Sequence, residues 1–422
     1  MILNILILCS VVVVAAGGRS PHADYVEELA RANAFGSRIS DNIMEDATLD
    51  LVGNLVNKYN YPFQEHSVIT QDGYILRMHR IPHGRDAHNA PGDRPVVFIM
   101  HGLCSSSADH VVMGPGTAMA YILAEEGYDV WMGNARGNYF SRRHILLNPD
   151  ALFNSNFWEF SWDEIGFYDL PAMIDYILRI TGRSGLHYIG HSQGTTAFFV
   201  MASRRPEYNG KIISMQALAP VAYMAYNRNR IFLRLAPHAR ELELATRLGL
   251  GEIFPRNDIF SWTGQTFCRD GAISQPLCSA IVFLVFGWNE VEHNATMLPV
   301  NLGHAPSGAA LRQFAHYGQS ITEKEFRRYD FGILRNLVEY GSAFPPRYDL
   351  SRITAPVFLH YSENDAFAHV NDVDRLHREL GNSLGMFVVP QPTFSHLDFI
   401  WGINAKTLLF DRVVSFMRLM GN

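Results

Sequence analysis

The chain has 422 residues, of which 48% are hydrophobic, 18% charged and 12% aromatic, and its formal net charge is −6. This amount of apolar material is enough for a large core, which excludes disordered, collagen-like and coiled-coil classes. The 35 lysines and arginines do not exceed the 41 aspartates and glutamates, and the charges form no acidic or basic tail. No nucleic-acid partner is therefore indicated.

The N-terminal residues have the character of an export signal. Residues 1–16 carry no charged side chain and contain an apolar run that is short for a membrane span. Small residues at its end suit signal-peptidase cleavage, so we predict a signal peptide over residues 1–17, with an N-terminal anchor as the alternative. No later stretch reaches the roughly 18 consecutive apolar residues of a membrane helix. We expect no transmembrane segment and a secreted protein, with the lysosome as the alternative location.

Cysteine usage and a sequon agree with export. Cys268 and Cys278 lie ten residues apart, which is close enough to close a small loop through a disulfide in an oxidising compartment. Cys104 is then left as a thiol. Asn294 begins an Asn-Ala-Thr sequence and is the predicted glycosylation site.

Short apolar runs alternate with helical stretches from about residue 96 onward. Apolar residues at helical spacing after Pro171 predict one helix, and further helices are expected over residues 194–203 and near residues 373–380. Strands that alternate with helices favour a mostly parallel sheet with helices on both faces. The predicted strands are residues 96–100, 128–132, 186–189, 211–218, 356–361 and 386–389.

The alternation stops after residue 219 and resumes at about residue 347. We predict an N-terminal polar segment over residues 18–45, an α/β core over residues 46–219 and 347–422, and an inserted cap or lid over residues 220–346. Ligands of open α/β sheets bind beyond the carboxyl ends of the strands, so a cap at that edge would cover the site.

Apolar residues within the predicted cap are candidates for an inner face that admits apolar chains. They are Leu242, Ala245 and Leu248, which belong to a Leu-rich helical stretch, and residues 280–287. Ordinary packing is the alternative for each.

The pentapeptide Gly190-His191-Ser192-Gln193-Gly194 has the pattern G-x-S-x-G. A predicted strand precedes it and a predicted helix follows it, which is the context of a nucleophile elbow. In such an elbow a tight turn exposes the serine oxygen. We predict that Ser192 is a nucleophile; the alternative is a Gly-rich turn with an incidental serine.

A serine nucleophile needs a histidine base and an orienting carboxylate, which follow in the order acid, then histidine, in this architecture. Asp365 comes just after the predicted strand 356–361, and His396 lies in the loop after strand 386–389. Loops at the ends of these strands would converge on Ser192.

Other residues compete for these two roles. Glu363 is the alternative acid, whereas Asp372 and Asp374 belong to the start of a predicted helix. His369 and His377 lie on the wrong segment to replace His396.

Two backbone amides are predicted to bind the oxyanion that develops in acyl transfer. One is that of Gln193, at the start of a helix, where the dipole favours negative charge. The other is that of Leu103, in the loop His101-Gly102-Leu103-Cys104. A mechanism through Cys104 is the alternative to a serine mechanism. No cofactor or metal site is predicted, because serine acyl transfer needs none and the histidines are scattered singly.

The sequence resembles the acid lipases, the group of gastric lipase and lysosomal acid lipase within the α/β-hydrolase superfamily. The resemblance extends over about residues 46–420. Its marks are Tyr61-Pro62, residues 71–76 (QDGYIL), His101-Gly102-Leu103, residues 129–138 (DVWMGNARGN), residues 157–164 (FWEFSWDE) and the elbow GHSQG. Cys104 and residues 301–308 depart from the family pattern.

The resemblance implies an α/β-hydrolase fold and a serine lipase that hydrolyses neutral lipid esters at a lipid–water interface. It implies Ser192, Asp365 and His396 as the triad, Leu103 and Gln193 as oxyanion donors, and a disulfide between Cys268 and Cys278. The alternatives are a carboxylesterase for other esters and a non-catalytic lipid-binding or storage protein on the same fold. A monomer is the expected oligomeric state.

Overall fold

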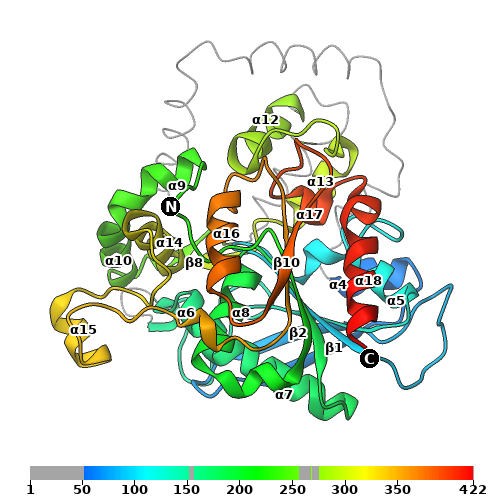
Figure 1. The fold of residues 1–422 in the computed structure, drawn as a ribbon, viewed down its shortest axis with the longest axis horizontal. Helices are drawn as coiled ribbons and strands as arrows, with labels where there is room; N and C mark the ends of the chain where they lie inside the picture. The colour runs from blue at the N-terminus through cyan, green and yellow to red at the C-terminus, as the bar shows by residue number, and fades with distance from the viewer. Residues whose placement is uncertain (1–51, 152–155, 256–267, 269–274, 422) are drawn as a thin grey trace.

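The computed structural model describes residues 52–151, 156–255, 268 and 275–421, and its centre is an eight-stranded sheet (Figure 1). The strand order is β1-β2-β4-β3-β5-β6-β9-β10. From β4 to β10 the neighbours are parallel, whereas β2 is antiparallel to both β1 and β4. The strands are β1 (Gln64–Ile69), β2 (Ile75–Ile81), β3 (Val96–Met100), β4 (Asp129–Gly133), β5 (Leu186–His191), β6 (Ile212–Leu218), β9 (Val357–Tyr361) and β10 (Ser383–Val388).

The strands predicted from residue 96 onward are confirmed to within a few residues, whereas β1 and β2 were not predicted. Strand β1 lies at the edge of the sheet, and its sequence QEHSVI is largely exposed and polar. An edge strand needs no continuous apolar run, so the signal that identifies central parallel strands is absent there. The predicted signal peptide (residues 1–17) and polar segment (residues 18–45) lie outside the described residues.

Helices cover both faces of the sheet, as expected for this pattern. Figure 1 shows α5 and α18 together on one side, where Arg418 pairs with Glu126, and α7, α8 and α16 on the other. The helices that flank the sheet are α4 (Val52–Lys58), α5 (Met119–Glu125), α6 (Trp162–Glu164), α7 (Leu170–Thr181), α8 (Gln193–Arg204), α16 (Val370–Glu379), α17 (Asp398–Trp401) and α18 (Asp411–Met420).

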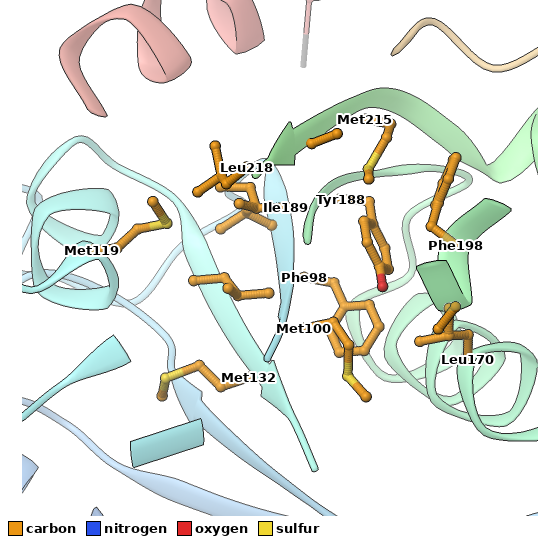
Figure 2. Packing of buried hydrophobic residues seen from close by; sticks show 14 of the residues in the cluster. Phe98, Met100, Met119, Met132, Leu170, Tyr188, Ile189, Phe198, Met215 and Leu218 are labelled. Carbon is orange, nitrogen blue, oxygen red and sulfur yellow. The ribbon is translucent and has the colours of Figure 1, made fainter. Parts of the chain in front are cut away.

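The core between the sheet and these helices is rich in large side chains (Figure 2). The ring of Tyr188 on β5 lies with its centroid 5.5 Å from that of Phe98 on β3 and 5.0 Å from that of Phe198 on α8. Its hydroxyl donates a 2.8 Å hydrogen bond to the carbonyl of Gly194. This buried tyrosine therefore fixes the first turn of α8 against the centre of the sheet.

The chain between β6 and β9 forms an additional set of helices, which Figure 1 shows beside and above the sheet. Cys268 and Cys278 form a disulfide that ties residue 268 to α12. The elements are α9 (Arg230–Leu235), α10 (Ala239–Arg247), β7 (Glu252–Ile253), α12 (Gln275–Phe286), α13 (Leu298–His304), β8 (Ala309–Ala310), α14 (Leu311–Glu323) and α15 (Ile333–Tyr340).

The candidates for an apolar inner face differ in their surroundings. Leu242 packs with Ala239 and Ala315 in a small separate core between α10 and α14, while Leu248 is exposed to solvent. Phe286, at the end of α12, is half-buried and packs against the main core. Within the ranges that the structure describes, none of the helices combines the length and apolar character that crossing a bilayer requires.

Candidate active site

Ser192 stands on a turn that only small neighbours permit. Its φ angle is 51°, in the left-handed region, and it joins the end of β5 to the start of α8. A β-carbon on Gly190 would lie 2.8 Å from the carbonyl carbon of Gly194, and one on Gly194 would lie 2.3 Å from the carbonyl oxygen of Met100. Both glycines of the pentapeptide are therefore sterically required, which is the physical meaning of the G-x-S-x-G pattern.

The hydroxyl of Ser192 is hydrogen-bonded to His396, which is in turn hydrogen-bonded to Asp365. The Oγ of Ser192 lies 2.8 Å from Nε2 of His396. The Nδ1 of His396 lies 2.9 Å and 2.8 Å from the two carboxyl oxygens of Asp365. The structure thus brings together the three predicted residues, from loops that are far apart in the sequence.

Asp365 is held as a carboxylate in a buried position. Burial raises its pKa, but the His396 charge and hydrogen bond oppose this effect, and the net pKa lies below its ordinary value. The backbone amides of Phe367 and Ala368 also donate to its Oδ1, at 2.7 and 2.9 Å. A carboxylate that accepts several such bonds remains ionised, so Asp365 can orient the imidazole and favour its protonated form.

The loop that contains Leu103 lies beside the serine. A β-carbon on Gly102 would lie 3.3 Å from Cβ and 3.7 Å from Oγ of Ser192. The buried ring of His101 lies with Nδ1 2.7 Å from the Gly102 carbonyl. Burial lowers the pKa of His101 to about 4, so the ring is neutral and its Nδ1–H donates to that carbonyl. This hydrogen bond holds the Gly102 carbonyl in place. The amide of Leu103 lies in the same peptide plane, so its orientation is held as well.

The sequence matches two family models and several curated lipases. Residues 52–114 match the family described as a partial alpha/beta-hydrolase lipase region, and residues 95–402 match the alpha/beta hydrolase fold. The chain is 44% identical to Lipase 1 of Drosophila melanogaster, over 88% of this chain and 80% of that protein. It is 36% identical to the lysosomal acid lipase/cholesteryl ester hydrolase of Homo sapiens, over 87% and 90% of the two chains. It is also 35% identical to the gastric triacylglycerol lipase of Bos taurus, over 93% and 96%.

The chain belongs to the family of gastric and lysosomal acid lipases. The predicted α/β-hydrolase fold is confirmed. A solved structure of a lipase described as putative, from Sulfolobus solfataricus, shares this fold with a TM-score of 0.54 at 15% identity, covering 85% of this chain and 94% of that one.

The alternative acids and histidines of this acid lipase lie elsewhere. Glu363 is exposed to solvent, whereas Asp365 is buried against His396. His369 is the N-cap of α16, and its Nε2 lies 2.6 Å from the Arg228 guanidinium. His377 is bonded to the hydroxyl of Ser383. Asp372 and Asp374 lie within α16.

Aromatic side chains surround the acid lipase site; Phe286 belongs to the predicted apolar run 280–287, whereas Phe232 and Phe367 were not predicted. The ring centroid of Phe367 lies 4.7 Å from that of His396 and 5.2 Å from that of Phe232 on α9. The centroid of Phe286, at the end of α12, lies 6.2 Å from that of Phe367. The only sequence signals for these contacts are the proximity of Phe367 to Asp365 and the apolar run of residues 280–287.

The remaining predicted residues have separate environments. Cys104 has a φ angle of 57°, and burial raises the pKa of its thiol. Gln193 begins α8, and its side-chain amide donates to the Oε1 of Gln313 at 2.6 Å. Asn294 is half-buried and accepts a 3.2 Å hydrogen bond from the Met297 amide, and its glycosylation stays a prediction. Among the described residues, no cluster of His, Cys, Asp and Glu side chains is arranged to hold a metal ion.

Proposed function

We propose that this acid lipase hydrolyses carboxylic esters of neutral lipids, triacylglycerol or cholesteryl ester, through an acyl-enzyme on Ser192. The observation that carries the proposal is the unbroken series of hydrogen bonds from the Ser192 hydroxyl through His396 to Asp365. The relatives named gastric triacylglycerol lipase and lysosomal acid lipase/cholesteryl ester hydrolase support the substrate class.

Acylation begins when Nε2 of His396 accepts the proton of the Ser192 hydroxyl. The serine oxygen forms a bond to the ester carbonyl carbon, and the carbonyl oxygen becomes an oxyanion that the amides of Leu103 and Gln193 stabilise. Asp365 fixes the tautomer of His396 and stabilises the imidazolium. The carbon–oxygen bond to the alcohol then breaks, and His396 returns its proton to the departing alcohol oxygen.

Deacylation repeats these steps with water. His396 accepts a proton from a water molecule, whose oxygen attacks the acyl carbon, and the same two amides hold the second oxyanion. The bond to Ser192 breaks, the fatty acid leaves, and the proton returns to the serine oxygen. Removing one oxyanion donor in such a site costs on the order of 3 kcal/mol of transition-state stabilisation.

We also propose residues 220–346 as the cap of this site. Phe232 and Phe286 come from that segment, and both lie near Phe367, which contacts the ring of His396. An apolar surround of this kind favours an acyl chain over water, because burial of apolar surface stabilises the complex by about 25 cal/mol per Å². We propose that the enzyme is exported and acts at a lipid–water interface.

The test measures fatty-acid release from emulsified triolein and cholesteryl oleate from about pH 4 to 8. Ser192→Ala is compared with the wild type and with Ser203→Ala, a buried serine of α8 whose hydroxyl donates to the Val200 carbonyl of its own helix. Release by wild type and Ser203→Ala but not by Ser192→Ala is expected. If the folded wild type releases no more than Ser192→Ala from either ester, the lipase proposal fails. Small esters would then test the carboxylesterase alternative.

A further inference from the structure

The last residue of α12 and the stretch after it are hydrogen-bonded to both loops of the candidate triad. We call residues 286–292 the brace. The carbonyl of Phe286 accepts from the His396 amide at 3.3 Å, and the carbonyl of Glu292 accepts from Ile403 at 3.1 Å. The side chain of Asn364, the neighbour of Asp365, donates to the Trp288 carbonyl at 2.9 Å. The brace thus joins the acid loop and the histidine loop from outside the sheet.

Asn289 is the side chain of the brace that bonds residues before and after His396. It is only 1% exposed. Its Nδ2 donates a 2.7 Å hydrogen bond to Oδ2 of Asp398, two residues after His396. Its Oδ1 accepts from the Thr393 hydroxyl at 3.0 Å, three residues before His396. The side-chain amide of Asn289 therefore holds the histidine loop both before and after His396 along the chain.

Asp398 transmits this contact to the backbone next to His396. The same Oδ2 that accepts from Asn289 also accepts from the Ser395 amide, at 2.5 Å. Burial raises the pKa of Asp398, the hydrogen bonds from Ser395 and Asn289 lower it, and the charge of Glu292 raises it, which together leave the pKa at about 6. A buried carboxyl needs its donors, because an unsatisfied buried acceptor costs about 1–3 kcal/mol. The contact with Asn289 is therefore part of what keeps the loop in place.

We infer that Asn289 is a positioning residue for His396: it fixes the loop of the catalytic base from the inserted segment. This inference rests on the proposed function. Since the hydrogen bond from the Ser192 hydroxyl to Nε2 of His396 spans only 2.8 Å, a small displacement of the loop would slow proton transfer between them. The loss is expected in kcat rather than in KM, because the hydrogen bonds of Asn289 are to the loop that carries the catalytic base.

The decisive variant is Asn289→Asp, which keeps the size of the side chain and replaces its donor by a carboxyl group. At low pH a proton between the new carboxyl group and Asp398 preserves the hydrogen bond. As the pH rises both groups ionise, and two adjacent carboxylates repel each other. We expect kcat with the soluble ester p-nitrophenyl butyrate to fall by roughly tenfold or more between about pH 5 and 7, relative to wild type, with KM little changed.

The structure contains a matched control. Asn336 is also buried, and its Nδ2 donates to Oδ1 of Asp330 at 2.7 Å, but this pair lies at α15, outside the triad loops. Asn336→Asp creates the same carboxyl pair and should leave the pH profile of kcat unchanged in folded protein. Thr393→Val, at an exposed position, removes the 3.0 Å hydrogen bond to Asn289 Oδ1 and leaves the longer contacts of Asn289 with Gln391, and it should lower kcat about threefold at constant KM.

The outcomes separate the two proposals. If Ser192→Ala keeps wild-type activity, both the proposed function and the positioning role are wrong. If Ser192→Ala is inactive while Asn289→Asp and Thr393→Val keep the wild-type kcat and pH profile, the positioning role alone is overturned. Titration of active sites with a phosphonate ester corrects kcat for the fraction of folded enzyme. If Asn289→Asp folds poorly, the kcat of Thr393→Val tests the positioning role instead.

Discussion

The α-carbon of Gly194 is packed so closely against Met100 that a β-carbon there would lie 2.3 Å from the Met100 carbonyl oxygen. This contact joins the start of α8 to the end of β3, directly before the loop that contains Leu103. The serine and the two proposed oxyanion donors are therefore held by one close approach between a helix and a strand.

Gly194→Ala should disturb this approach. Because the clash is with backbone, we expect a loss of about 1–3 kcal/mol in the free energy of unfolding, together with a large loss of esterase activity. Gly210→Ala is the control, since a β-carbon there would meet nothing within 4 Å. Urea unfolding and ester hydrolysis measure the two effects. Equal stability of both variants would contradict the steric argument.

Asp365→Asn should lower kcat by about 10⁴-fold, because an amide no longer stabilises the imidazolium and favours the wrong tautomer. Glu363→Gln, at an exposed position two residues away, should retain wild-type kcat. Since the pKa of Asp365 lies below its ordinary value, its carboxylate should not titrate in the activity profile above about pH 5. A kcat that falls with Glu363→Gln and not with Asp365→Asn would reverse the assignment of the acid.

His110→Phe should make the enzyme more resistant to acid. His110 is buried, neither ring nitrogen has a hydrogen-bond partner among the described residues, and burial lowers its pKa to about 3. Below about pH 6.5 the imidazole of His110 is protonated in the unfolded chain but stays neutral in the folded protein. Folding stability is therefore lost as the pH falls from about 6.5 to the folded pKa of His110. Phenylalanine removes this dependence.

The check on His110 is the melting temperature at about pH 4.5 and 7.5. The gain from His110→Phe should be larger at the lower pH, whereas the same change at the exposed His238 should show no such difference. A gain that is the same at both pH values would show that protonation of His110 does not limit stability.

Thiol reagents should leave the activity intact. Burial raises the pKa of Cys104, so little reactive thiolate is present near neutral pH. We expect iodoacetamide at about pH 7.5 to leave most of the ester hydrolysis, and Cys104→Ala to remain active while Ser192→Ala is not. Rapid inactivation by iodoacetamide that Cys104→Ala abolishes would revive a cysteine mechanism.

The sequence by itself determined the central strands, the elbow and the order of its partners. Central parallel strands are continuous apolar runs because both of their faces are buried, and the turn at Ser192 needs glycines on either side. Both features therefore leave a local sequence pattern from which they can be predicted. The strand β1 was missed because an exposed edge strand leaves a polar pattern.

Only the tertiary structure decided between Asp365 and Glu363, and only it revealed the contacts of Asn289 with the histidine loop. Two acids in one turn have nearly the same local sequence, and what separates them is which side chain meets His396 from the loop of the neighbouring strand. Asn289 lies 107 positions before His396, and nothing in the neighbouring sequence indicates a contact with the histidine loop. Hydrogen bonds between distant segments depend on how the helices and loops pack, which is a property of the whole fold rather than of any local pattern.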